Sequence, residues 1–257
     1  MYPKLWIFDT YGILIALGVL ACFGYLEIYF RRRKADRRLI LDIEINALVA
    51  IIIGLLFAVL FQNLYDFIEN PSSYQWTWAL TFYGGLIGGA ISFLSGHFFF
   101  LEKHYPGYMK DFLPIAPACI SVAHGFGRIG CFLAGCCYGG VTDSPLGVLF
   151  PGMEHKVWPT NLFEAIFLLV LSSILLFLAM KKNRSSLGPA IYLIAYGIWR
   201  FLIEYLRGDH RGQFIPGLTP SQFWSIIMVI GGLLYLFILY RIKKKKTLPL
   251  IIKDKEE

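Results

Sequence analysis

The stretch HGFGRIGCFLAGCCYG, residues 124–139, places one arginine and three cysteines in a segment that is otherwise apolar enough to lie in a membrane. A charged side chain in the middle of a bilayer costs roughly 3 kcal/mol or more, so such residues are rare and are functional by default. Arg128 therefore marks a candidate functional site and requires a partner of opposite charge.

The composition of the whole chain is that of an integral membrane protein. Of its 257 residues, 57% are hydrophobic and only 16% are charged, which is more apolar surface than a soluble core of this size can bury. No low-complexity linker or repeat divides the chain, and residues 1–12 do not resemble a cleavable signal peptide. We expect an all-α, polytopic membrane protein in which residues 1–257 form a single integral membrane domain.

Seven segments come close to the roughly 20 apolar residues that a membrane span requires. They are Tyr11–Phe30, Ile45–Tyr65, Trp76–Phe100, Phe112–Cys137, Trp158–Met180, Leu187–Leu206 and Ser221–Tyr240. The fourth contains two prolines and several glycines, which predicts a broken or re-entrant helix. Irregular backbone at membrane depth is tolerated only where protein or a water-filled cavity covers it, so this segment again indicates a site.

The distribution of basic residues predicts the orientation. With the N-terminus outside, 18 lysines and arginines lie in the inner loops and the C-terminal tail, and four lie outside. Positively charged loops stay on the cytoplasmic side, so we expect an N-out/C-in topology. The formal net charge of +7 follows from this bias and from attraction to anionic lipid, and we expect no nucleic-acid partner.

The sixth segment carries a polar stripe. Tyr196, Arg200, Glu204 and Arg207 occur at offsets of 0, 4, 8 and 11, which places them on one face of a helix. Arg200 and Glu204 can pair at i, i+4, which reduces the burial cost of each charge. The pair is either a structural lock between helices or part of a site. Together with Arg128, two guanidinium groups favour a clamp for an anion, and phosphate matches the planar fork best.

Two further patterns allow more than one interpretation. Gly84 and Gly85 either let two helices pack closely, which is the favoured reading taken alone, or open the backbone to a ligand beside Tyr83. Cys131, Cys136 and Cys137 form either a metal or redox cluster or a set of small packing residues. Their spacing lacks a second ligand pair, and a vicinal disulfide would be strained. We therefore expect packing, with no metal and no cofactor.

Four motifs of this chain, taken in order, resemble those of prolipoprotein diacylglyceryl transferases. YGGLIGG (83–89) resembles the family's His-Gly-Gly motif, and HGFGRIGCFLAGCCYG resembles its signature loop, in which a Gly-Arg-x-Gly-Asn-Phe core precedes a glutamate. WPTNLFE (158–164) resembles its Pro-x-Gln-Leu-Tyr-Glu motif, and YGIWRFLIEYLRGD (196–209) its Tyr-Gly-x-x-Arg-x-x-x-Glu-x-x-Arg motif. The likeness covers nearly the whole chain, and the order of four motifs is more specific than any one of them.

The resemblance implies a reaction, a location and a set of residues. The family transfers the diacylglyceryl group of phosphatidylglycerol to the cysteine thiol of a lipoprotein signal peptide, forming a thioether and releasing glycerol phosphate. The implied partners are thus phosphatidylglycerol or another anionic phospholipid and a signal peptide, at the bacterial plasma (inner) membrane. The implied catalytic residues are Arg128, Arg200, Glu204, Tyr196 and Tyr83. The implied substrate-binding residues are Tyr11, Gly84, Gly85, Gly127, Gly130, Glu164 and Arg207.

The chain departs from the family pattern at three positions. Tyr83 stands where the motif has histidine, Cys131 where it has asparagine, and Cys136 where it has glutamate. A phenol, whose pKa is about 10, is a poor general base near neutrality. Three functions therefore stay open at this point: diacylglyceryl transfer to a lipoprotein cysteine, a related lipid or glycerol-phosphate transfer to another acceptor, and non-catalytic lipid binding or transport.

Overall fold

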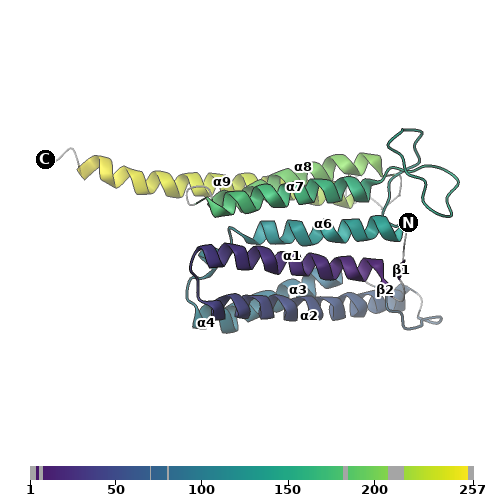
Figure 1. The fold of residues 1–257 in the computed structure, drawn as a ribbon, viewed down its shortest axis with the longest axis horizontal. Coiled ribbons are helices and arrows are strands. Elements are labelled where there is room, and N and C mark those ends of the chain that lie inside the picture. Colours follow the sequence, from purple (N-terminus) through teal and green to yellow (C-terminus); the bar gives the residue numbers. More distant parts are fainter. Residues whose placement is uncertain are drawn as a thin grey trace. The chain divides into compact units, whose positions relative to one another are not determined.

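The computed structural model describes residues 4–5, 8–69, 71–79, 81–181, 185–207 and 217–253, and this part of the chain is almost entirely helical (Figure 1). Two strands of two residues, β1 (Lys4–Leu5) and β2 (Phe8–Asp9), pair antiparallel before the first helix. The predicted helical class is therefore confirmed.

Long apolar helices dominate the fold. In chain order they are α1 (Thr10–Arg32), α2 (Arg37–Glu69), α3 (Phe82–Gly96), α6 (Ala116–Ala134), α7 (Thr160–Met180), α8 (Gly188–Ile203) and α9 (Pro220–Lys253). The shorter elements are the π-helix η1 (His97–Leu101), α4 (Glu102–His104), α5 (Met109–Phe112) and the 3-10 turns η2 (Ser185–Leu187) and η3 (Glu204–Leu206). Within the described residues, six helices are long and apolar enough to cross a membrane: α1, α2, α3 continued to His104, α6, α7 and α9.

Two of the predicted spans differ from the observed helices. The segment predicted to begin at Trp76 becomes helical only at Phe82, because residues 76–79 have no regular structure. The segment predicted at Leu187–Leu206 corresponds to the 16-residue α8 followed by η3. The α8 helix alone is therefore shorter than the six apolar helices, of which the shortest has 19 residues.

The predicted fourth segment is interrupted before α6 and not inside it, because residues 113–115, which include Pro114, form a turn and α6 is one continuous α-helix. Pro117 lies in its first turn, where a backbone N–H has no partner within the helix, so the ring does no damage. The helix ends at Gly135, whose φ of +72° is a left-handed conformation that glycine adopts without strain. Inside the helix, Gly125 allows close packing, since a Cβ there would lie 3.0 Å from Leu169 of α7.

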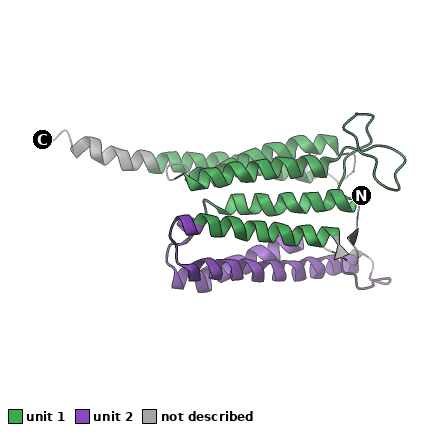
Figure 2. Ribbon diagram, viewed as in Figure 1, with its two compact units in different colours: residues 1–29, 113–257 green, residues 30–112 purple. Residues whose placement is uncertain are grey.

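The chain forms two compact units (Figure 2). In unit 2, residues 30–112, α2 packs along α3 through glycines. A Cβ added to Gly84 would lie 2.7 Å from the carbonyl oxygen of Phe57, and one added to Gly54 would lie 3.0 Å from that of Gly85. These contacts support the helix-packing interpretation of Gly84 and Gly85. The side chain of Tyr83 lies outside the described part of the structure.

Unit 1, residues 1–29 and 113–257, contains α1, α6, α7, α8 and α9. Here α6 packs on α7, α8 packs on α9, and α1 approaches α6 at Gly18, where a Cβ would lie 3.0 Å from the carbonyl oxygen of Ala123. Because successive helices alternate in direction, the C-terminal ends of α6 and α8 meet the N-terminal ends of α1, α7 and α9. The polar residues of the predicted motifs collect at this end of unit 1.

Candidate functional site

Glu164, in the second turn of α7, is the centre of the buried polar cluster. The residue is only 1% exposed. Its Oε2 forms an ion pair with Nε of Arg128 on α6 at 3.0 Å, and its Oε1 accepts a hydrogen bond from the hydroxyl of Tyr196 on α8 at 2.9 Å. One carboxylate therefore ties three helices together and supplies the opposite charge that Arg128 requires.

His124 completes this cluster from one turn before Arg128. Its Nε2 accepts a hydrogen bond from Nε of Arg128 at 3.3 Å and lies 3.9 Å from Oε1 of Glu164. Its ring also meets the ring of Tyr196 edge to face, with centroids 5.5 Å apart. Because its Nε2 acts as an acceptor, the imidazole is neutral in this arrangement. The sequence analysis did not predict this role, although the i, i+4 spacing from Arg128 was a signal for it.

A second cluster surrounds Arg200 at the end of α8. Its Nη2 forms an ion pair with Oε2 of Glu204 at 2.9 Å and donates to the hydroxyl of Ser221 on α9 at 2.7 Å. The hydroxyl of Thr219 donates to the other oxygen of Glu204 at 3.0 Å. The predicted i, i+4 pair is therefore present, and residues at the start of α9, which sequence reasoning missed, hold both of its members.

Nη1 of Arg200 is buried and has no hydrogen-bond partner among the described residues. The Arg200 side chain is 12% exposed, and that of Arg128 is 19% exposed. Both interactions of Arg128 use Nε, which leaves its two terminal NH₂ groups for another partner. An unsatisfied buried donor costs about 1–3 kcal/mol and more when it is charged, so the free guanidinium edge of Arg200 indicates a ligand.

The two clusters form one electrostatic unit. Glu164 interacts electrostatically with Arg200 as well as with Arg128. Two guanidinium groups and two carboxylates, with a neutral imidazole, give these groups a net charge of zero, which keeps the cost of burial low. Each carboxylate thus orients one arginine, Glu164 the side chain of Arg128 and Glu204 that of Arg200. Tyr196, on the same helix as Arg200, donates to Glu164.

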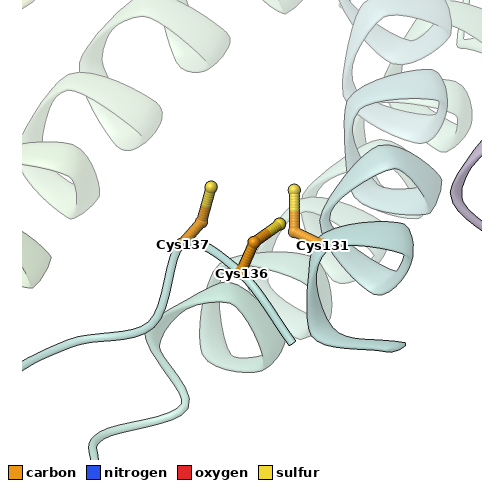
Figure 3. Close-up of side chains that lie close together, drawn as sticks. All are labelled: Cys131, Cys136 and Cys137. Carbon is orange, nitrogen blue, oxygen red and sulfur yellow. The ribbon is translucent and has the colours of Figure 1, made fainter. Parts of the chain in front are cut away.

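The three cysteines of the opening motif lie together at the C-terminal end of α6, Cys131 in its last turn and the other two just after it (Figure 3). The Sγ atoms of Cys131, Cys136 and Cys137 all lie within 4.8 Å of one another. Cys131 is buried, whereas Cys136 and Cys137 are exposed. The packing role predicted from the sequence thus fits Cys131 but not the other two. A hydrogen bond from the Cys131 thiol and the positive charge of Arg128 hold the pKa of the Cys137 thiol well below its usual value.

The remaining predicted residues fall into two groups. In unit 1, Tyr11 lies beside Gly130, where a Cβ would be 2.9 Å from its ring, and Arg207 interacts electrostatically with Cys137. Gly127 faces open space, since nothing lies within 4 Å of an added Cβ. Tyr83, Gly84 and Gly85 belong to unit 2. The structure therefore brings together Arg128, Glu164, Tyr196, Arg200 and Glu204, with Tyr11, Gly130 and Arg207 nearby.

The chain is similar to proteins of one known family over most of its length. Residues 5–238 match the family model for prolipoprotein diacylglyceryl transferase. A phosphatidylglycerol–prolipoprotein diacylglyceryl transferase of Clostridium tetani is 34% identical over 242 residues, covering 91% of this chain and 94% of the relative. A second such transferase of Clostridium perfringens is 33% identical over 252 residues (92% and 91%), and one of Francisella tularensis is 31% identical over 250 residues (92% and 91%).

Proposed function

Because the chain belongs to the prolipoprotein diacylglyceryl transferase family, we propose that its unit 1 site transfers the diacylglyceryl group of phosphatidylglycerol to a prolipoprotein cysteine. The observation that carries the assignment to this site is the buried Nη1 of Arg200, a charged donor without a hydrogen-bond partner in the described part of the chain. A phosphate oxygen supplies the missing acceptor. The terminal NH₂ groups of Arg128 supply further donors to the same headgroup.

The reaction makes use of these donors. The acceptor thiol loses its proton, which water or the departing phosphate monoester takes up, and its sulfur attacks the glycerol carbon that is esterified to phosphate. A C–S bond forms while the C–O bond breaks, and the bonding electron pair moves to the phosphate oxygen of the departing glycerol phosphate. Guanidinium groups fixed in advance around that oxygen stabilise the charge that grows there, in a site with little water to compete. They also favour the thiolate over the thiol.

The carboxylates keep the arginines in place during this reaction. Glu164 fixes Arg128 through Nε, and Glu204 fixes Arg200 through Nη2, so the other edge of each guanidinium faces the substrate. Tyr196 and Ser221 restrain Glu164 and Arg200 in turn. Such support from surrounding residues decides whether charged groups are held accurately enough for catalysis.

The proposed arrangement has seven spans in a bacterial plasma membrane. They are the six apolar helices and, in addition, α8. The α8 helix and η3 together comprise residues 188–206, a length of about 28 Å at 1.5 Å per residue, close to the hydrocarbon thickness of about 30 Å. The continuous α-helix of this segment, 16 residues, is shorter than the six apolar helices, and η3 extends it. With the N-terminus outside, the site lies in the outer half of the bilayer, where the cysteine of a translocated signal peptide is accessible.

A related transfer to another acceptor is the second candidate. It is favoured by Cys131 and Cys136, which occupy the signature positions where the family pattern has asparagine and glutamate, and by Tyr83 in place of histidine. The arginine clusters do not discriminate between the two, because both reactions use the same phospholipid. The identity of the acceptor therefore has to be measured.

The test is a transfer assay with the purified full-length protein in phosphatidylglycerol vesicles. A peptide carrying a lipoprotein signal sequence is the acceptor, and mass spectrometry detects the added diacylglyceryl group. Arg128→Gln and Arg200→Gln should each abolish the product, whereas Arg33→Gln, at an exposed ion pair with Asp111, should leave it unchanged. No diacylglyceryl peptide from a folded wild-type protein contradicts transfer to this acceptor, and full activity of either site variant contradicts the assignment of the site.

A further inference from the structure

The cysteine cluster has the geometry of a metal site. The Sγ atoms of Cys131, Cys136 and Cys137 lie within 4.8 Å of one another (Figure 3). Three thiolates around a zinc ion, with Zn–S bonds of about 2.3 Å in tetrahedral directions, are about 3.8 Å apart. Each sulfur therefore needs to move by about 1 Å or less, which a rotation about χ1 provides. The spacing of the cysteines in the sequence argued against a metal site only under the assumption that the ligands come in two separate pairs.

The backbone explains why residues so spaced come together. Gly135 ends α6 in a left-handed turn, and the amide of Cys136 then donates to the carbonyl of Cys131 at 3.0 Å. This turn folds the chain back over the last turn of the helix. Cys136 is thereby placed beside Cys131 rather than beyond it.

The loop is held in this shape by the start of α7. The side chain of Asn161 donates to the carbonyl of Cys136 at 2.7 Å, and the hydroxyl of Thr160 donates to that of Cys137 at 3.2 Å. Cys137 itself adopts a φ of +59°, a left-handed conformation that is unfavourable for a residue with a Cβ and persists only when the surroundings impose it. The three thiols are therefore arranged by a rigid frame.

Charge and access also suit a metal ion. Arg128 interacts electrostatically with Cys131 and Cys137, and Arg207 with Cys137, so three thiolates around one cation would be partly neutralised. Cys136 and Cys137 are exposed, which gives an ion a path to the site. No histidine or carboxylate of the described residues joins the three sulfurs to make a larger group. This leaves one coordination position open.

We propose that Cys131, Cys136 and Cys137 form a trithiolate site for a soft metal ion of the Zn(II) or Cu(I) class. Thiolate ligands select these ions over harder cations such as Mg(II) or Ca(II). Three-coordinate Cu(I) and four-coordinate Zn(II) with a water both fit a three-sulfur site. The assignment is independent of the transfer reaction, because it concerns atoms that the proposed lipid site does not use.

The test is a metal titration of the purified full-length protein in detergent, kept reduced by a thiol-free reductant. After titration with Zn(II) alone, or with Cu(I) alone, and dialysis against a weak chelator, elemental analysis should find about one ion per chain for at least one of the two metals. The exposed Cys136→Ser should lower the affinity at least tenfold. Cys22→Ser, at a cysteine remote in sequence from the cluster, should not change it.

Spectroscopy separates a built site from adventitious binding. With Co(II) as the probe, sulfur-to-metal charge-transfer absorption should appear in the wild type and weaken in Cys136→Ser, while the circular dichroism and thermal transition of the variant stay as in the wild type. Retention of neither Zn(II) nor Cu(I), or equal retention after Cys131, Cys136 and Cys137 are all changed to serine, overturns the proposal. Loss of the metal in the Cys22→Ser control would do the same.

Discussion

Replacing Glu164 by glutamine tests the central claim about the site, because it removes one charge and changes little else. Glu164 is 1% exposed, forms an ion pair with Arg128 and accepts a hydrogen bond from Tyr196. A glutamine keeps one acceptor, but its NH₂ group would then face a second donor. Arg128 would remain buried without a counterion.

The expected loss of stability follows from these contacts. Removing one member of a buried ion pair typically costs about 3–5 kcal/mol, because the other charge is left uncompensated. Arg128 is 19% exposed and keeps its contact with His124 at 3.3 Å, so the lower end, about 3 kcal/mol, applies. Arg128→Gln should cost a similar amount, because it leaves the carboxylate alone. The double variant forms a neutral amide pair, so its loss of stability should be about 2 kcal/mol smaller than the sum of the two single losses.

Denaturant unfolding of the four proteins in mixed micelles measures this coupling, and the transfer assay gives the effect on activity. Both single variants should lose at least about 100-fold in rate, since a misplaced guanidinium no longer matches the transition state. The double variant should regain stability but not activity, because its Arg128 is absent. Additive stability losses, within about 0.5 kcal/mol, would refute the direct coupling of Glu164 to Arg128.

Three further predictions follow from other contacts. Arg200→Lys keeps the positive charge but loses the planar guanidinium with its paired donors, so the KM for phosphatidylglycerol should rise at least about tenfold in vesicle assays. An unchanged KM would contradict the assignment of Arg200 to the headgroup site. Because the pKa of the Cys137 thiol is lowered, a larger fraction of it is thiolate at pH 6 than for an ordinary cysteine, and mass spectrometry should find Cys137 alkylated by iodoacetamide faster than Cys22 at that pH. Cys131→Ala should slow the alkylation of Cys137. Equal rates of this alkylation in the wild type and in Cys131→Ala would contradict the hydrogen bond. Gly84→Ala should cost about 1–3 kcal/mol in denaturant unfolding, since its Cβ would lie 2.7 Å from a backbone oxygen of Phe57; a neutral effect would disprove the close packing.

The local parts of the site were predictable from the sequence, and the long-range parts were not. Arg200 and Glu204 lie one turn apart, so helix periodicity alone brings them together. Arg128 and Glu164 lie on different helices, and their pairing depends on how α6 and α7 rotate against each other, which the glycine at position 125 helps to determine. Periodicity carries no such information. Family resemblance indicated both residues, without indicating that they touch.

The fold shows the same division. Apolar length predicted most of the spans, because a bilayer imposes it. The break expected in the fourth segment lies at residues 113–115 and leaves α6 intact, because Pro117 falls in the first turn of that helix, where a proline does no damage. The packing role expected for the three cysteines fits only Cys131, for a related reason. A single left-handed glycine reverses the chain after α6, and a spacing rule does not take account of such a turn.

The zero net charge of the buried clusters bears on how the enzyme turns over. Phosphatidylglycerol brings a phosphodiester with one negative charge, which two arginine edges accept at little cost. Glycerol phosphate leaves as a monoester, whose second ionisation lies near pH 6, so it carries nearly two charges at neutral pH. The arginine edges that stabilise the growing charge in the proposed mechanism also hold this dianion, and the fixed carboxylates of Glu164 and Glu204 offset only part of that attraction. We therefore expect product release to limit turnover, and acidification, which protonates the monoester, to speed it.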